Sequence, residues 1–173
     1  MRRIEAAGLT LEPQTAAHAD EMFLVLSDPA IYTFENKPPP SVEWLRSRFE
    51  RLETRQSADG CEQWLNWVAR VPSSQLIGYV QATVRSNGSA AIAYEMCSSQ
   101  WGRGLAHQAT EALIGELIEK YRVTLLTAVA KRENLRSLRL LERLGFSLAT
   151  PELHAEHQVE QSEVLMYRKV SSE

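Results

Sequence analysis

A short segment with two glycines, residues 101–106 (WGRGLA), joins a strand-like run to a long helical run. The strand-like run covers residues 90–97, and the amphipathic helical run covers residues 107–121. Gly102 and Gly104 let the backbone approach a ligand closely, because glycine has no Cβ to block the approach. The first turn of a helix presents unpaired N–H groups and the positive end of the helix dipole. The segment therefore predicts a binding site for a phosphate or pyrophosphate group.

Periodicity in the rest of the chain predicts one mixed sheet flanked by helices. Strand patterns cover residues 8–12, 63–71, 76–85, 89–97, 123–130 and 162–170. The Asn87-Gly88 pair between two of these strands is a strong hairpin signal. Helical patterns cover residues 15–27, a segment that begins at 41–44, residues 107–121 and residues 134–144. This order predicts a single α/β domain over residues 1–173, with its core at about 8–170.

The ends and inner faces of the helices can also be predicted. Thr15 and Ser41 are typical N-cap residues for the first two helices, and Gly145 is a typical terminator for the last. Apolar positions at helical spacing should face the sheet. In the third helix these are Leu105, Ala109, Leu113 and Leu117, and in the fourth they are Leu135, Leu138, Leu141 and Leu144.

Composition limits the partners that this chain can have. With 173 residues and 44% hydrophobic content, it can bury a full core without metals or disulfides. A net charge of −3 argues against nucleic acid as the main partner, since binding to a phosphate backbone needs a basic face. No apolar run approaches the ~20 residues of a membrane span, and the N-terminus lacks the apolar stretch of a secretory signal. Cys61 and Cys97 lie far apart without CxxC spacing, so we expect free thiols in a cytoplasmic protein.

Two common phosphate-binding motifs do not fit the glycine segment. A P-loop places Lys and then Ser or Thr after its last glycine, whereas here Gly104 is followed by Leu105 and Ala106. A dinucleotide fingerprint requires glycine where this chain has His107, and it belongs to an early strand–helix–strand unit. ATP, GTP and dinucleotides are therefore not the expected ligands.

Three motifs, in order along the chain, resemble the GNAT superfamily of acetyl-CoA-dependent N-acetyltransferases, and most closely its RimJ/RimL-type branch. They are residues 101–106, residues 134–137 (NLRS) and residues 144–146 (LGF). In the family signature Gln/Arg-x-x-Gly-x-Gly/Ala, Gly104 and Ala106 match the small positions, and Trp101 replaces Gln or Arg, as is common in that branch. The resemblance implies a twisted, mixed, mostly antiparallel sheet of about seven strands with about four helices. That sheet splays between its fourth and fifth strands, where acetyl-CoA binds as co-substrate.

The resemblance also implies which residues hold acetyl-CoA. Backbone groups of Met96 and Cys97 would bond the pantetheine and the thioester carbonyl, and Asn134 would contact the pantetheine arm while capping the last helix. N–H groups of the glycine segment and first helical turn would surround the pyrophosphate, with Arg103 adding charge. The cofactor-binding positions of this part are Trp101, Gly102, Arg103, Gly104, Leu105, Ala106 and His107.

Glu95 is the candidate for the general base that takes a proton from the attacking amine. It lies on the strand that enters the glycine segment, where a carboxylate can point at the cleft and act through water. The alternative is a surface carboxylate in ordinary alternation with Tyr94 and Met96. The sequence leaves both interpretations open.

Ser137 is the candidate for the acid that protonates the leaving thiolate. Many relatives place a tyrosine seven residues after the asparagine, but this chain has Leu141 there. Members of the RimJ/RimL-type branch often carry serine at the position of Ser137, where the hydroxyl could donate a proton or order a water. The alternative is a hydroxyl bonded to its own helix backbone.

Other chemically reactive residues have structural explanations. His154 and His157 have a spacing seen at metal sites, but positions three apart on a strand face opposite ways, so we expect no metal. Cys97 is expected to be a small buried hydrophobe rather than an acylated nucleophile. Residues of the core or of a groove wall are expected at Trp44, Trp64 and Trp67.

The acetyl acceptor is the least constrained feature. The resemblance places acceptor contacts in residues 32–44 and 150–161, whose acidic residues would favour a cationic amine. These acidic residues include Glu35, Glu152, Glu156 and Glu160. An α-amine, with a reference pKa of ~8, is easier to deprotonate than a lysine at ~10.4. This difference favours a protein or peptide N-terminus or an amino acid, and other small-molecule amines stay open.

Two further classes of protein remain as alternatives. One is a non-catalytic acyl-CoA-binding sensor, for which the missing tyrosine at Leu141 would be a sign of lost chemistry. The other is an interaction module without a cofactor, against which Gly102, Gly104 and Asn134 argue. No interface can be read from the sequence, so both a monomer and a homodimer stay open.

Overall fold

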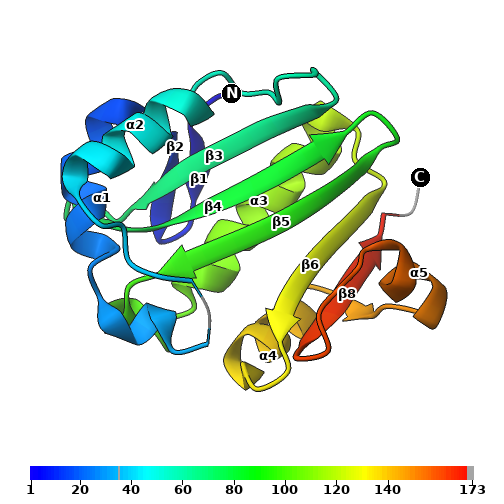
Figure 1. Cartoon of the computed structure of the whole chain (residues 1–173). Coiled ribbons are helices and arrows are strands. Elements are labelled where there is room, and N and C mark those ends of the chain that lie inside the picture. The colour runs from blue at the N-terminus through cyan, green and yellow to red at the C-terminus, as the bar shows by residue number, and fades with distance from the viewer. Residues whose placement is uncertain (35, 171–173) are drawn as a thin grey trace.

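The computed structural model describes residues 1–34 and 36–170, which fold around one eight-stranded sheet (Figure 1). The strands are β1 (Ile4–Ala6), β2 (Leu9–Pro13), β3 (Glu62–Arg70), β4 (Leu76–Arg85), β5 (Ser89–Met96), β6 (Leu125–Lys131), β7 (Ser147–Leu148) and β8 (Glu163–Lys169). Their order in the sheet is β1-β2-β3-β4-β5-β6-β8-β7. All neighbours pair antiparallel except β5 and β6, which pair parallel.

Five α-helices accompany the sheet in the described part of the chain. They are α1 (Ala19–Val25), α2 (Val42–Leu52), α3 (Leu105–Tyr121), α4 (Leu135–Arg143) and α5 (Pro151–Glu156). Three short 3-10 turns, Ala16–His18, Pro29–Tyr32 and Ser98–Gln100, lie in the connections. Figure 1 shows α3 behind the sheet, where it contacts β1, β2, β4 and β5, while α1 and α2 pack beside each other. None of the described helices is long and apolar enough to cross a membrane.

The predicted caps and the predicted inner face of α3 are confirmed. The Ser41 hydroxyl accepts a hydrogen bond from the Trp44 N–H at 3.1 Å, and Thr15 caps the 3-10 turn before α1. Four positions of α3 form one buried stripe against the sheet, as helical spacing requires. They are Leu105, Ala109, Leu113 and Leu117.

The sheet opens between β5 and β6. These two parallel strands pair only from Ser89 to Ala91 on β5 and from Leu125 to Thr127 on β6. Beyond Ala91 the strands diverge, and β5 continues to Met96 while β6 turns toward α4 (Figure 1). β1 is a short strand at the N-terminal edge that precedes the first predicted strand, so β5 and β6 are the fourth and fifth predicted strands. The split between them is the one predicted for the family fold.

One predicted inner position of α4 is wrong. Leu135 is 56% exposed, and Leu140, at 6% exposed, takes a place in the core beside Leu141 and Leu144. Leucines spaced by three residues advance about 300° per step, so they drift around a helix with about 100° per residue. Leu135 is also the first residue of α4, at the mouth of the split.

The segment that contains His154 and His157 is helical, not extended as the sequence analysis assumed. Thr150 caps α5 by accepting a hydrogen bond from the Leu153 N–H at 3.3 Å, and Pro151 takes the first helical position. An N-cap threonine followed by proline is a recognised helix start, so the signal was present in the sequence.

Candidate active site

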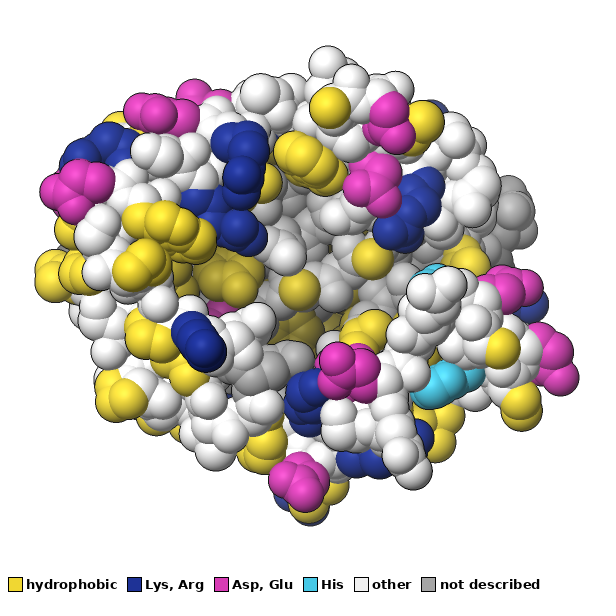
Figure 2. Space-filling view, in the orientation of Figure 1, with side chains coloured by type: hydrophobic (Ala, Val, Ile, Leu, Met, Phe, Trp, Pro, Cys, Tyr) yellow, Lys and Arg dark blue, Asp and Glu magenta, His cyan; other side chains and the backbone are white. Residues whose placement is uncertain are grey.

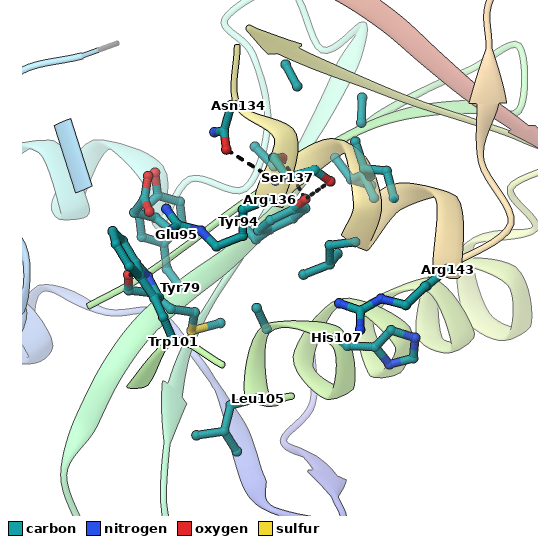
Figure 3. A pocket seen from close by; sticks show the side chains of 18 of the residues that line it. Tyr79, Tyr94, Glu95, Trp101, Leu105, His107, Asn134, Arg136, Ser137 and Arg143 are labelled. Atoms are coloured by element: carbon teal, nitrogen blue, oxygen red, sulfur yellow. Dashed lines mark hydrogen bonds between the residues drawn. The ribbon is translucent and has the colours of Figure 1, made fainter. Parts of the chain in front are cut away.

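A cavity of about 300 Å³ fills the split between β5 and β6 (Figure 3). Its walls come from the end of β5, the glycine segment, the first turn of α3, β6 and the inner side of α4. Ten of the twelve predicted site residues line it: Glu95, Met96, Trp101, Gly102, Gly104, Leu105, Ala106, His107, Asn134 and Ser137. Cys97 and Arg103 do not line it. The fold therefore brings together most residues that the motifs selected.

The glycine segment has the backbone shape that its sequence predicted. Gly102 and Gly104 have φ angles of +75° and +76°, a region that side chains other than glycine rarely adopt. A Cβ built on either glycine meets no protein atom within 4 Å, so the space beside both is open. Gly104 is the N-cap of α3, and the N–H groups of the following turn precede the first intrahelical bonds. These open N–H groups fit an anionic phosphate group.

The two backbone positions at the end of β5 differ in what they bond. The Cys97 N–H donates to the Ile77 carbonyl at 2.8 Å, so this group is used inside the sheet. Alternation along an antiparallel strand then turns the Met96 N–H toward the split. The Met96 carbonyl accepts a hydrogen bond from Trp101 Nε1 at 2.8 Å. Cys97 is buried beside Ser99, in agreement with the expectation of a small buried hydrophobe.

Gly78 on β4 allows β4 and β5 to come unusually close at this point. A Cβ built on Gly78 would lie 2.0 Å from the Glu95 carbonyl oxygen and 2.8 Å from the Met96 Cα. Both contacts are to backbone, which has little freedom to move. Only glycine fits here, and this close approach sets the path of β5 where Glu95 and Met96 enter the cavity.

A partly buried hydroxyl pair crosses the split between β5 and α4 (Figure 3). Asn134 Oδ1 accepts from the Ser137 N–H at 3.2 Å, which confirms the predicted cap of α4. The Ser137 hydroxyl lies 2.8 Å from the Tyr94 hydroxyl, which also donates to the Ser137 carbonyl at 3.3 Å. Burial raises the pKa of Tyr94 to about 12, so its phenol is neutral at ordinary pH and can donate to Ser137.

Tyr94 is a member of the site that was not predicted from the sequence. The family pattern places a tyrosine on α4, where Leu141 lines the cavity instead. Tyr94 reaches the same helix from β5. The signal was its spacing of two residues from Met96, which places both side chains on one face of the strand.

Arginines of α4, rather than Arg103, supply positive charge to the cavity wall. The Arg136 guanidinium carbon lies 3.3 Å from the centre of the Trp101 ring, a cation–π contact across the split. Arg143 also lines the cavity. Arg103 is exposed and donates to Gln100 Oε1 at 2.7 Å. Helical spacing on α4 could have indicated the two arginines, because their positions lie seven residues apart.

A second cavity, of about 380 Å³, adjoins the first and lies against α2 and the loop before it. Four residues line both cavities: Asn36, Tyr79, Ala93 and Glu95. Figure 2 shows this face of the molecule hollowed at its centre, with Lys and Arg side chains along part of the rim. The two cavities meet where the predicted base stands.

The negative charge of Glu95 acts on Tyr32, a residue of the second cavity. Burial raises the pKa of Tyr32 to about 12, and the negative charges of Glu95 and Asp28 act in the same direction. Tyr32 lines the second cavity together with Glu95. A carboxylate shared by both cavities is well placed to accept a proton from a group in the second cavity when that group reacts with a ligand held in the first cavity.

Residues 150–161 do not take part in either cavity, contrary to the expectation for acceptor contacts. Glu160 instead forms a salt bridge with Lys131 at 3.1 Å. Glu35 lies outside the described residues. Within residues 1–34 and 36–170, no group of three His, Cys, Asp or Glu side chains is arranged to hold a metal.

The predicted roles of the three tryptophans are partly distinguished by burial. Trp67 is fully buried in the core, and Trp64 is partly buried on the same strand. Trp44 is 47% exposed and forms part of the wall of the second cavity.

The family described as "Acetyltransferase (GNAT) domain" matches residues 8–147. The chain belongs to the GNAT acetyltransferase family. A comparison with curated proteins found no significant match. The fold and the order of motifs inferred from the sequence are those of this family, and its members carry acetyltransferase activity.

Several solved structures share the fold over nearly the whole chain. RimL, a ribosomal L7/L12 α-N-protein acetyltransferase in complex with coenzyme A, has a TM-score of 0.82 at 16% identity, covering 99% of this chain and 100% of that one. A ribosomal-protein-S5-alanine acetyltransferase from Vibrio fischeri has a TM-score of 0.79 at 15% identity, covering 98% and 97%. A GNAT-family acetyltransferase from Bacillus anthracis has a TM-score of 0.75 at 15% identity, covering 97% and 98%. At these identities the neighbours show that the fold is shared.

Proposed function

We propose that this GNAT acetyltransferase transfers the acetyl group of acetyl-CoA to a primary amine by direct attack within a ternary complex. The observation that carries the proposal is the pair of adjoining cavities that share Glu95. One cavity ends at a glycine-lined helix N-terminus and suits the phosphorylated co-substrate. The other opens beside α2 and suits the acceptor. The domain that carries this activity extends over the described chain, with its core at 8–170.

Acetyl-CoA fits the first cavity on the properties of the residues present. The open space above Gly102 and Gly104 and the N–H groups from Gly102 to His107 would hold the pyrophosphate. Met96 would present its N–H to the pantetheine and thioester, and Asn134 would contact the pantetheine arm. Trp101, Leu105 and Ala106 complete that wall. Arg136 and Arg143, which line the cavity, would contribute more positive charge than the exposed Arg103.

Glu95 and Ser137 would handle the two proton transfers of the reaction. The amine nitrogen forms a bond to the thioester carbonyl carbon, and Glu95 takes the proton that the nitrogen loses, directly or through a water. The C–S bond then breaks, and Ser137 donates the proton that the CoA sulfur gains. Tyr94 orients the Ser137 hydroxyl, and solvent restores the proton to Ser137.

One structural neighbour is named a ribosomal L7/L12 α-N-protein acetyltransferase, and another is named a ribosomal-protein-S5-alanine acetyltransferase. An α-amine, with a reference pKa of ~8, loses its proton more readily than a lysine at ~10.4, which suits a single carboxylate base. We therefore propose an α-amine acceptor, on a protein or peptide N-terminus or on a small molecule. A monomer or a homodimer in the cytoplasm would serve this role equally well.

The test is the release of CoA thiol from acetyl-CoA in the presence of amine acceptors. The panel contains peptides with free N-termini, amino acids and simple amines, and the acetylated product is identified by mass. Amine-dependent CoA release with formation of an N-acetyl product is the expected result. Acetyl-CoA binding without release on the whole panel would instead identify the non-catalytic sensor and overturn the proposal.

A further inference from the structure

The second cavity has a positive rim, which the sequence analysis did not expect. Lys37 and Arg48 line it, and Glu95 is the single acidic residue among the described residues of its wall. Within that part of the chain, neither Lys37 nor Arg48 forms a salt bridge. The Arg48 guanidinium carbon lies 5.7 Å from the centre of the Trp44 ring. Both cations are thus available to a negatively charged group.

Polar groups on the inner wall of the same cavity are buried and incompletely bonded. Gln14 is 4% exposed and Asn66 is 5% exposed, and the Gln14 N–H donates to the Asn66 carbonyl at 2.9 Å. Gln14 Nε2 has no hydrogen-bond partner among the described residues. A buried donor left unpaired costs about 1–3 kcal/mol, so an acceptor oxygen on a ligand would be favoured here.

One side of the remaining wall is apolar. It is formed by side chains of α2 and the end of α1, with one aromatic ring half exposed at the edge. These residues are Leu26, Trp44, Leu45, Phe49 and Leu52. A cavity of about 380 Å³ with such a wall suits a small molecule that has an apolar portion.

We propose that the acceptor is a small primary amine that carries both a carboxylate and an apolar side chain, the chemistry of an apolar amino acid. This inference rests on the proposed acetyltransferase function and assigns the class of substrate to its second cavity. The amine faces Glu95 at the junction with the first cavity. The carboxylate pairs with Arg48 and Lys37, since charge-assisted bonds to arginine are among the stronger polar contacts. The apolar side chain packs against the wall formed by α2.

This charge distribution disfavours two other kinds of acceptor. A polyamine would bring further positive charges to a rim that already carries Lys37 and Arg48. A peptide N-terminus has an amide where the free amino acid has its carboxylate, so the two cations would lose their partner.

The experiment compares matched amines that differ only in the carboxylate. L-phenylalanine is paired with L-phenylalaninamide and 2-phenylethylamine, and L-leucine is paired with 3-methylbutylamine, while CoA thiol release is followed. Loss of one charge-assisted interaction corresponds to about tenfold, so kcat/KM should be about tenfold or more higher for each carboxylated acceptor. Equal or higher kcat/KM for the amides and simple amines overturns the inference while leaving the acetyltransferase function intact.

The Arg48→Gln variant tests whether Arg48 is the partner of the substrate carboxylate. The variant should lower the ratio of kcat/KM for L-phenylalanine over 2-phenylethylamine by about tenfold. Arg51→Gln, an exposed position on the same helix outside the cavity, should keep that ratio. An unchanged ratio in Arg48→Gln overturns the assignment of the rim.

Failure of the proposed function would be seen separately. It corresponds to no CoA release with any amine of the panel. Binding of L-phenylalanine, measured by calorimetry, then tests the second cavity on its own: binding that Arg48→Gln weakens supports the carboxylate site, and no binding overturns it.

Discussion

Replacing Glu95 by glutamine is expected to lower kcat by about 10²–10⁴-fold, the usual contribution of a general base. Glutamine keeps the size and hydrogen-bonding capacity of the side chain, but its amide cannot accept the proton of the attacking amine. Glu95 lines both cavities, at the side where they meet, whereas the glycine segment lies at the start of α3. The Kd of acetyl-CoA should therefore stay nearly unchanged.

The measurement is steady-state CoA release across about pH 6–9, a range that spans the α-amine pKa of ~8, together with acetyl-CoA binding. Glu50→Gln, an exposed carboxylate on α2 that lines neither cavity, is the control for loss of one negative charge. Full activity of Glu95→Gln over this whole range would remove Glu95 from the mechanism and leave it an ordinary strand carboxylate.

Replacing Gly78 by alanine is expected to damage the fold and the active site together. The added methyl group would lie 2.0 Å from the Glu95 carbonyl oxygen, so β4 and β5 must separate at the point where β5 enters the cavity. Overpacking of this kind typically costs about 1–3 kcal/mol and sometimes more. We expect the free energy of unfolding to fall by this amount. We also expect activity to fall by more than the fraction of unfolded protein can explain.

Chemical denaturation and CoA release under conditions where the variant is folded measure these two effects. Gly115→Ala is the matched control, because Gly115 lies on the exposed side of α3 with no atom within 4 Å of an added Cβ. That change should stabilise the helix by about 0.5–1 kcal/mol. A Gly78→Ala protein with wild-type stability and activity would show that the close approach of the strands has no consequence.

The glycine segment and the elements around it could be predicted because their signals are local. Gly102 and Gly104 need positive φ angles, and Asn134 caps the helix that it precedes. The alternation of β5 and the helical spacing of α3 are likewise properties of neighbouring residues. Two very short strands, β1 and β7, were missed because two or three residues carry no readable pattern.

Features that depend on contacts between distant elements could not be predicted. Tyr94 and Ser137 are 43 positions apart and meet only because β5 and β6 diverge beside α4. Gly78 gave no turn signal, since its importance lies in the neighbouring strand rather than in its own φ angle. The basic rim of the second cavity was also missed, because counting acidic residues in two loops does not show which loop reaches the site.

The most direct test of the account is calorimetric titration of acetyl-CoA into the wild-type protein, Gly104→Ala and Gly60→Ala. Gly104 and Gly60 have φ angles of +76° and +72° and open space around the missing Cβ, so both variants carry the same backbone strain of about 1–2 kcal/mol. Gly60 lies before β3, outside the cavity. We expect saturable binding of acetyl-CoA to the wild-type protein, which Gly60→Ala preserves and folded Gly104→Ala weakens. No binding by the wild-type protein, or equal binding by all three, would contradict the placement of acetyl-CoA in the split between β5 and β6.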